Sequence, residues 1–196
     1  MIEHRPWIGR NYDTGIDRKR ILVVGYSHWG SVDHEGLTEE VVSHWARGNE
    51  NAPFAPRIRQ YFDYEDPATF WQSVAFANSL PNCVGEEADR YADGTPGQIA
   101  AIAPRALRLI HALEPDLIFV FSRKAWKRWP EYDGDHPDRT LYVEGVGQFD
   151  AGTYRHASGE SIAFGFGHPQ YAPVGPTRIA VQAAMRIEAE DLLLNA

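Results

Sequence analysis

Apolar positions along the chain follow two alternating patterns, compact runs and helical stripes. Compact runs of β-branched and aromatic residues are typical of buried strands, because a parallel sheet is covered on both of its faces. Runs of this kind predict strands at 20–26, 74–78, 115–121, 140–143 and 161–166. Residues 1–20 follow neither pattern, and we expect an irregular lead-in there.

Helical stripes occupy most of the sequence between these runs. Asp66-Pro67 and Thr95-Pro96 each combine a capping side chain with a proline suited to the first helical turn. Apolar residues recur at helical spacing after each start, for example Val41, Val42 and Trp45. The predicted helices begin at Thr38, span 56–62 and 67–71, open at Thr95 and continue past Ile110, and span 124–129 and 177–194.

Strands that alternate with helices predict an α/β fold. The expected architecture is a three-layer α/β/α sandwich around a largely parallel central sheet. No repeat and no shift in composition divides the chain, so we expect a single domain over residues 1–196.

Charge and cysteine content narrow the classes of function. The net charge of −8 argues against a non-specific polyanion binder, because Lys and Arg supply that affinity, but it leaves room for a local basic face. The lone Cys83 excludes an intramolecular disulfide and an iron–sulfur cluster held by four cysteines of one chain. No signal segment and no apolar run of membrane-spanning length is present. We therefore expect a cytoplasmic monomer with no membrane partner, no metal and no cofactor.

Ligand-binding side chains follow the ends of the predicted strands. Gly25–Trp29 follows the first strand, Asn78 ends the second, Ser122 ends the third and His168 comes after the last. Open α/β folds bind ligands at the carboxyl ends of their strands, so these segments are expected to meet in one site. The remaining histidines lack ligand-like spacing.

Three of these segments, in this order, resemble the motifs of the uracil-DNA glycosylase superfamily. They are Gly25-Tyr-Ser-His-Trp29, Phe76-Ala-Asn78 and His168-Pro-Gln-Tyr-Ala-Pro173. The intervening segment Leu113–Trp126 is similar to the family's strand followed by a small residue, a basic residue and alanine. The resemblance covers roughly residues 20–175 and implies a DNA repair enzyme of base excision, a monofunctional N-glycosyl hydrolase that flips uracil or another deaminated base out of DNA.

The resemblance also implies a role for each residue of a base pocket. Gly25 and Tyr26 form its floor, and Trp29 packs beside the flipped base. The Asn78 amide, which can accept and donate at once, reads the O4 and N3–H edge of uracil. His168 donates to uracil O2 as negative charge develops on the departing base.

Contacts to DNA are implied for two further groups. Ser122, Arg123 and Lys124 hold phosphates at a helix N-terminus. The segment Pro169–Ala172 enters the minor groove, with Gln170 or Tyr171 as the wedge that fills the vacated stack.

The first motif departs from the family at the positions that activate water. A carboxylate or amide is expected one or two places after its glycine, and related sequences often read Gly-Glu-Ser-His. Here Tyr26 and Ser27 occupy these places, and neither is a good base near neutral pH. The water is then left to Asp33 or Glu35, reaching back from the next few residues, or to His28.

Two other functions remain open at this point. A glycosylase-like module that binds DNA without cutting it, or cuts it only weakly, would explain the missing carboxylate. A serine esterase would use Ser27 as nucleophile, Asn78 in the oxyanion hole and His168 as base. Such esterases carry an aspartate three residues before the histidine, where this chain has Gly165.

Overall fold

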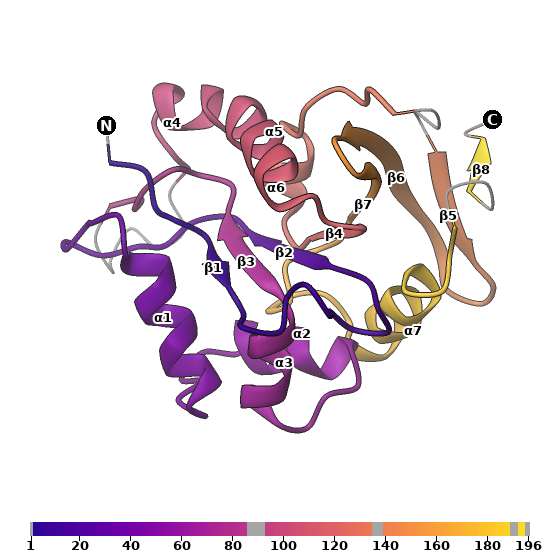
Figure 1. The fold of residues 1–196 in the computed structure, drawn as a ribbon, viewed down its shortest axis with the longest axis horizontal. Helices are drawn as coiled ribbons and strands as arrows, with labels where there is room; N and C mark the ends of the chain where they lie inside the picture. The colour runs from indigo at the N-terminus through magenta and orange to yellow at the C-terminus, as the bar shows by residue number, and fades with distance from the viewer. Residues whose placement is uncertain (1, 86–92, 135–138, 189–191, 195–196) are drawn as a thin grey trace.

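The computed structural model describes residues 2–85, 93–134, 139–188 and 192–194. Its strands form one eight-stranded sheet in the order β1-β3-β2-β4-β7-β6-β5-β8 (Figure 1). No helix among the described residues is both long and apolar enough to cross a membrane.

Four parallel strands form the centre of the sheet. They are β3 (Ala75–Asn78), β2 (Ile21–Gly25), β4 (Leu117–Val120) and β7 (Gly159–Gly165). Gly25 lies opposite Asn78, and Val120 lies opposite both Val24 and Gly165. Because these strands end in register, the segments that leave them emerge at one edge of the sheet.

Four antiparallel strands complete the sheet on its two sides. They are β1 (Trp7–Ile8), β6 (Gly147–His156), β5 (Arg139–Val143) and β8 (Leu193–Leu194). The expectation of a largely parallel sheet is thus correct for the central strands, and the sheet as a whole is mixed. β1 lies within the lead-in that we expected to be irregular, and β6 was not predicted at all.

Helices pack against both faces of the sheet (Figure 1). Ile21 and Val23 belong to a core with residues of α1, α2, α3 and α7, whereas Leu22 and Val24 belong to a core with α5. This alternation is what a strand buried on both faces requires. The helices are α1 (Leu37–Ala46), α2 (Phe54–Tyr61), α3 (Pro67–Ser73), α4 (Pro96–Ala100), α5 (Ile102–Leu113), α6 (Arg123–Trp126) and α7 (Val174–Ala184).

Three predicted helices differ from the observed ones. The helix that opens at Thr95 is interrupted at Ala101, because Pro104 lacks the N–H that would bond to the carbonyl of Ala100. The helix predicted at 124–129 ends at Trp126. The last helix was predicted to run to Leu194 but ends at Ala184, and the chain then returns so that Leu192 packs into the core.

Candidate functional site

A cavity of about 820 Å³ opens at the carboxyl ends of β2, β3 and β4. Its other walls come from α1, from the start of α2 and from the segment that follows β7. Most of the residues assigned above to the base, to DNA or to catalysis line it; the exceptions are Gly25, Asp33, Glu35, Pro169 and Ala172. Those that line it are Tyr26, Ser27, His28, Trp29, Asn78, Ser122, Arg123, Lys124, His168, Gln170 and Tyr171.

The floor of the cavity requires a glycine at position 25. A Cβ built on Gly25 would lie 2.4 Å from Asn78 Oδ1 and 3.2 Å from the Phe54 ring. Any side chain there would therefore push Asn78 and Phe54 out of place. Gly25 underlies the cavity even though it contributes no wall of its own.

Asn78 is 3% exposed and is held through its backbone. Its carbonyl oxygen accepts a hydrogen bond of 3.0 Å from Nε of Arg105, a buried guanidinium that also donates to the His4 carbonyl. Within the described part of the chain, the Asn78 side-chain amide makes no hydrogen bond to protein. The amide is thus anchored in position and has its donor and acceptor available to a ligand.

His168 is oriented by its neighbours in the same loop. The Gln170 N–H donates to Nδ1 of His168 over 3.2 Å, so the ring proton of the neutral imidazole belongs on Nε2. The ring lies between Phe54 and Tyr171, with centroid distances of 5.3 and 5.7 Å. Burial lowers the pKa of His168, which favours the neutral form. His168 therefore presents a neutral N–H donor.

Arg57 of α2 holds the backbone of the loop that carries His168. Its Nη1 donates to the carbonyl oxygens of Pro169 and Gln170 over 2.6 and 2.7 Å. Two backbone N–H groups, of Tyr171 and Ala172, donate in turn to the His168 carbonyl. Tyr171 projects from this fixed turn and is 68% exposed.

His28 forms another part of the wall, beside α1. Its Nε2 lies 3.0 Å from the Thr38 hydroxyl, and its ring centroid lies 5.5 Å from that of His4. Burial, followed by the proximity of His4, lowers the pKa of His28 to about 3. A histidine with this pKa is neutral near pH 7, so it can orient a water molecule but has no proton to give as an acid.

The basic side of the cavity carries its own counter-charge. Lys124 Nζ lies 2.5 Å from the Asp93 carboxylate and 5.7 Å from the centre of the Tyr26 ring. The Tyr26 hydroxyl also reaches Asp93, over 3.5 Å. Ser122 is 4% exposed, and its hydroxyl accepts the Ala125 N–H as the cap of α6, a helix of only four residues. Ser122 is thus largely committed to the fold.

Neither carboxylate that we expected to reach back lines the cavity. Asp33 accepts hydrogen bonds from His4 Nε2 and the Cys83 N–H, and Glu35 pairs with Arg5 on the surface. Among the described residues, Glu40 of α1 is the carboxylate of the cavity wall. Its Oε2 lies 3.6 Å from Nε2 of His34, and its side chain is 67% exposed at the rim.

Glu40 and Phe54 are two of the cavity residues that the motifs did not indicate. Glu40 comes from a helix outside the three motifs, although Val41 and Trp45 on the same helix also line the cavity. Phe54 opens α2 and contacts the ring of His168, a position that no local pattern marks. Trp29, expected beside the base, is 45% exposed.

The chain was compared with known proteins. No protein-family model and no curated protein sequence matches it.

Proposed function

We propose that the chain is a uracil-DNA glycosylase-like enzyme that flips a uracil out of DNA and hydrolyses its glycosidic bond. The observation that carries this proposal is the single cavity in which the first-motif segment, Asn78 and His168 meet. In the same proposal, the helices on both faces of the sheet are the outer layers of a three-layer α/β/α sandwich, and uracil-containing DNA is the partner.

The base would be recognised on the cavity floor. The Asn78 amide has the donor and the acceptor that match O4 and N3–H of uracil, and Arg105 holds it in position. Phe54 and Asn78 both border Gly25 on the floor, whereas Trp29 is exposed, so we assign to Phe54 the apolar contact with the ring of the base. Trp29 would then contact the neighbouring part of the strand at the rim.

His168 would stabilise the departing base. As the bond from C1′ of the sugar to N1 of uracil breaks, its electron pair stays with the base, and negative charge grows on O2. A neutral Nε2–H aimed at that oxygen acts only as charge develops, which is how a preorganised donor lowers a barrier. Removing such a donor typically costs about 3 kcal/mol of transition-state stabilisation.

Glu40 would activate the hydrolytic water, and His28 would orient it. Water adds its oxygen to C1′ of the oxocarbenium-like sugar, and the proton that it loses passes to the Glu40 carboxylate. His28 is neutral, and its imidazole would orient the water without a change in charge. Glu40 supplies the carboxylate that the first motif lacks.

The remaining cavity residues would contact the DNA strand. Arg123 and Lys124 supply positive charge for phosphates at the basic side of the cavity. Tyr171 is exposed on a turn fixed by Arg57, which suits a side chain that fills the space left by the flipped base.

The hydrogen bond at His168 Nδ1 argues against the serine esterase. A serine triad needs Nδ1–H to donate to a carboxylate so that Nε2 can take the serine proton. Here Nδ1 accepts the Gln170 N–H, and no carboxylate in the described part of the chain bonds to His168. Ser27 and His168 share the cavity but lack the third member.

The test is incubation with single- and double-stranded oligonucleotides that contain one uracil, followed by alkaline cleavage of abasic sites. We expect strand breaks at the uracil position and release of free uracil. Absence of breaks on both substrates at high enzyme excess would leave the non-catalytic DNA-binding module as the function.

Two variants separate the proposed activity from its rivals. His168→Ala should abolish most uracil release while DNA binding, measured by fluorescence anisotropy, is retained. Ser27→Ala should leave uracil release within a few fold of the parent. Hydrolysis of a p-nitrophenyl ester that is lost in Ser27→Ala would instead support the esterase.

A further inference from the structure

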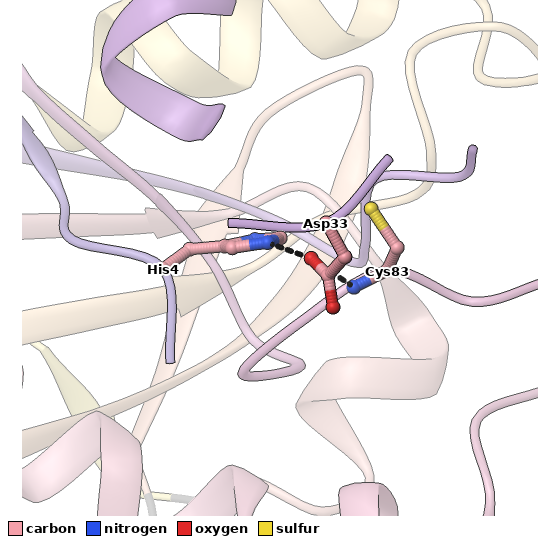
Figure 2. Close-up of side chains that lie close together, drawn as sticks. All are labelled: His4, Asp33 and Cys83. Atoms are coloured by element: carbon pink, nitrogen blue, oxygen red, sulfur yellow. Dashed lines mark hydrogen bonds and ion pairs between the residues drawn. The ribbon is translucent and has the colours of Figure 1, made fainter. Parts of the chain in front are cut away.

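A cluster of three metal-ligating side chains lies behind the wall of the cavity. His4 precedes β1, Asp33 follows β2, and Cys83 follows β3 (Figure 2). One ligand atom from each residue lies within 4.8 Å of the other two. Figure 2 shows the imidazole of His4 and the backbone nitrogen of Cys83 both bonded to the Asp33 carboxylate.

Among the described residues, the three side chains make few hydrogen bonds outside the cluster. His4 Nε2 lies 2.5 Å from Asp33 Oδ1, and the His4 side chain is fully buried whereas that of Asp33 is 24% exposed. The other ring nitrogen, His4 Nδ1, is buried without a hydrogen-bond partner. The Cys83 thiol donates a weak hydrogen bond of 3.9 Å to the Val32 carbonyl and lies beside the Asp33 carboxylate.

We propose that His4, Asp33 and Cys83 bind one Zn²⁺ ion, with a water as the fourth ligand. An imidazole, a thiolate and a carboxylate in one cluster suit a borderline divalent cation, and Zn²⁺ accepts all three. Mg²⁺ and Ca²⁺ are disfavoured because they select oxygen ligands. Three protein ligands leave the fourth coordination position of Zn²⁺ open. A water molecule can reach this position from solvent, because the Asp33 side chain is partly exposed. This proposal departs from the expectation of a metal-free protein.

Binding of Zn²⁺ would release the proton of the Cys83 thiol. Burial, followed by the Asp33 carboxylate, raises the pKa of the Cys83 thiol to about 12, so the metal-free protein keeps the thiol protonated. Zn²⁺ would displace the thiol proton to solvent and bind the thiolate. It would also replace the hydrogen bond between His4 Nε2 and Asp33, with the ring proton then on Nδ1.

The ion would tie together three segments that position the glycosylase-like cavity. The loop with Asp33 follows Tyr26–Trp29, and the loop with Cys83 follows Asn78. The His4 ring lies beside that of His28, which lines the cavity. Zn²⁺ would thus act as a structural brace, and its binding does not depend on which reaction the cavity performs.

The test uses the full chain without a polyhistidine tag, treated with a chelator and then dialysed. Isothermal titration with Zn²⁺ should give one ion per chain and a rise in melting temperature. Co²⁺ in place of Zn²⁺ should give thiolate-to-metal charge-transfer absorption in the near ultraviolet, which reports the Cys83 sulfur directly. Failure of the untagged parent chain to bind Zn²⁺ at one ion per chain would overturn the proposal.

Three variants make the assignment specific. Cys83→Ala should abolish the charge-transfer band and weaken Zn²⁺ binding by at least about tenfold, with an unchanged melting temperature in chelator. Asp33→Asn should weaken binding as well. His111→Ala, on the exposed side of α5, is the control and should bind as the parent does. Unchanged Zn²⁺ binding by Cys83→Ala would mean that the ion binds elsewhere.

Discussion

His28 and His168 are neutral for different reasons, and this determines what each can do. His168 receives an N–H from the loop and keeps its own proton for a ligand. His28 lies beside His4 and Thr38, where burial and the neighbouring imidazole disfavour its protonated form. His28 therefore links the folding stability of the protein to pH.

We expect the free energy of unfolding to fall as pH drops from 7 to 5. His28 has an ordinary pKa of 6.5 when unfolded and a pKa of about 3 when folded, so the unfolded chain takes up a proton that the folded chain refuses. The stabilisation is complete above the unfolded value and is lost as pH falls toward the folded value. The slope from this residue reaches at most about 1.4 kcal/mol per pH unit. Urea denaturation at several pH values measures it.

The control for this pH effect is the variant His28→Gln, which keeps a polar side chain near Thr38 but has no group that titrates. Its stability should depend less on pH over the same range, in which the aspartates and glutamates stay ionised. The lowered pKa of His168 acts in the same direction, so His168→Gln is the matched second variant. Equal slopes in the parent and in both variants would contradict the assignment.

Glu40→Gln should slow uracil release by roughly two powers of ten, because the amide cannot take the proton of the attacking water. DNA affinity should hold or rise, since one negative charge is removed near the strand. Single-turnover rates and anisotropy separate the two effects. Glu35→Gln removes the same charge from a carboxylate that pairs with Arg5, away from the cavity, and should react at the parent's rate.

The cavity residues that could be predicted from the sequence are those that directly follow the ends of strands. Tyr26–Trp29, Asn78 and His168 meet because parallel strands that end in register bring together whatever follows them. Glu40 and Phe54 reach the same cavity from helices whose docking depends on tertiary packing. No local pattern states which turn of such a helix faces a ligand.

At the scale of elements, α2 connects the cavity floor to the loop that carries His168. Phe54 opens this helix, and Arg57 lies one turn later, so both project from the same side. Phe54 contacts the His168 ring while Arg57 binds the loop carbonyls just after it. Displacement of α2 would therefore move both Phe54, the proposed contact of the base, and His168, the proposed N–H donor.

Arg57→Met should reduce the rate of uracil release about tenfold by loosening the loop that orients His168. The effect is expected on kcat more than on KM, with little change in melting temperature because Arg57 is partly exposed. Arg57→Lys should recover part of the loss through one of the two carbonyl bonds. Arg47→Met, which removes an exposed bond to Ser43, should have no effect on rate. A rate loss in Arg47→Met of the same size would point to charge rather than positioning.

The elements that the sequence predicted correctly are those with strong local signals. β2 and β4 are apolar runs buried on both faces, and Asp66 caps α3 by accepting the Thr69 N–H as its motif indicates. β6 was missed because its buried stretch Ala151–Tyr154 contains a glycine and a threonine, and the residues on either side are half-buried or exposed, so its apolar pattern is weak. The terminal helix was predicted too long because the apolar residues after Ala184 are buried without a helix: Leu192 packs into the core, and Leu193–Leu194 pair with β5.

For the whole molecule, the net charge of −8 would limit how the proposed DNA partner is bound. Positive charge at the cavity comes chiefly from Arg123 and Lys124, and Asp93 already neutralises part of it. Recognition of a flipped base, rather than a broad phosphate-binding surface, would then supply most of the affinity.

We expect DNA affinity to depend only weakly on salt. A plot of log K against log salt should have a slope no steeper than about −3, since each neutralised phosphate contributes roughly −0.9. Asp93→Asn releases Lys124 and should raise affinity and steepen the slope by up to about 0.9. Asp63→Asn, at an ion pair with Arg178, removes the same charge elsewhere and is the control.

The two outermost strands of the sheet have a consequence for association between copies. β1 and β8 are only two residues long, and they cover the outer sides of β3 and β5 in part. A longer bare strand would offer a continuous row of backbone donors and acceptors on which another chain could align. Here each outermost strand offers a row of only two residues, so β1 and β8 hinder growth of the sheet by strand addition.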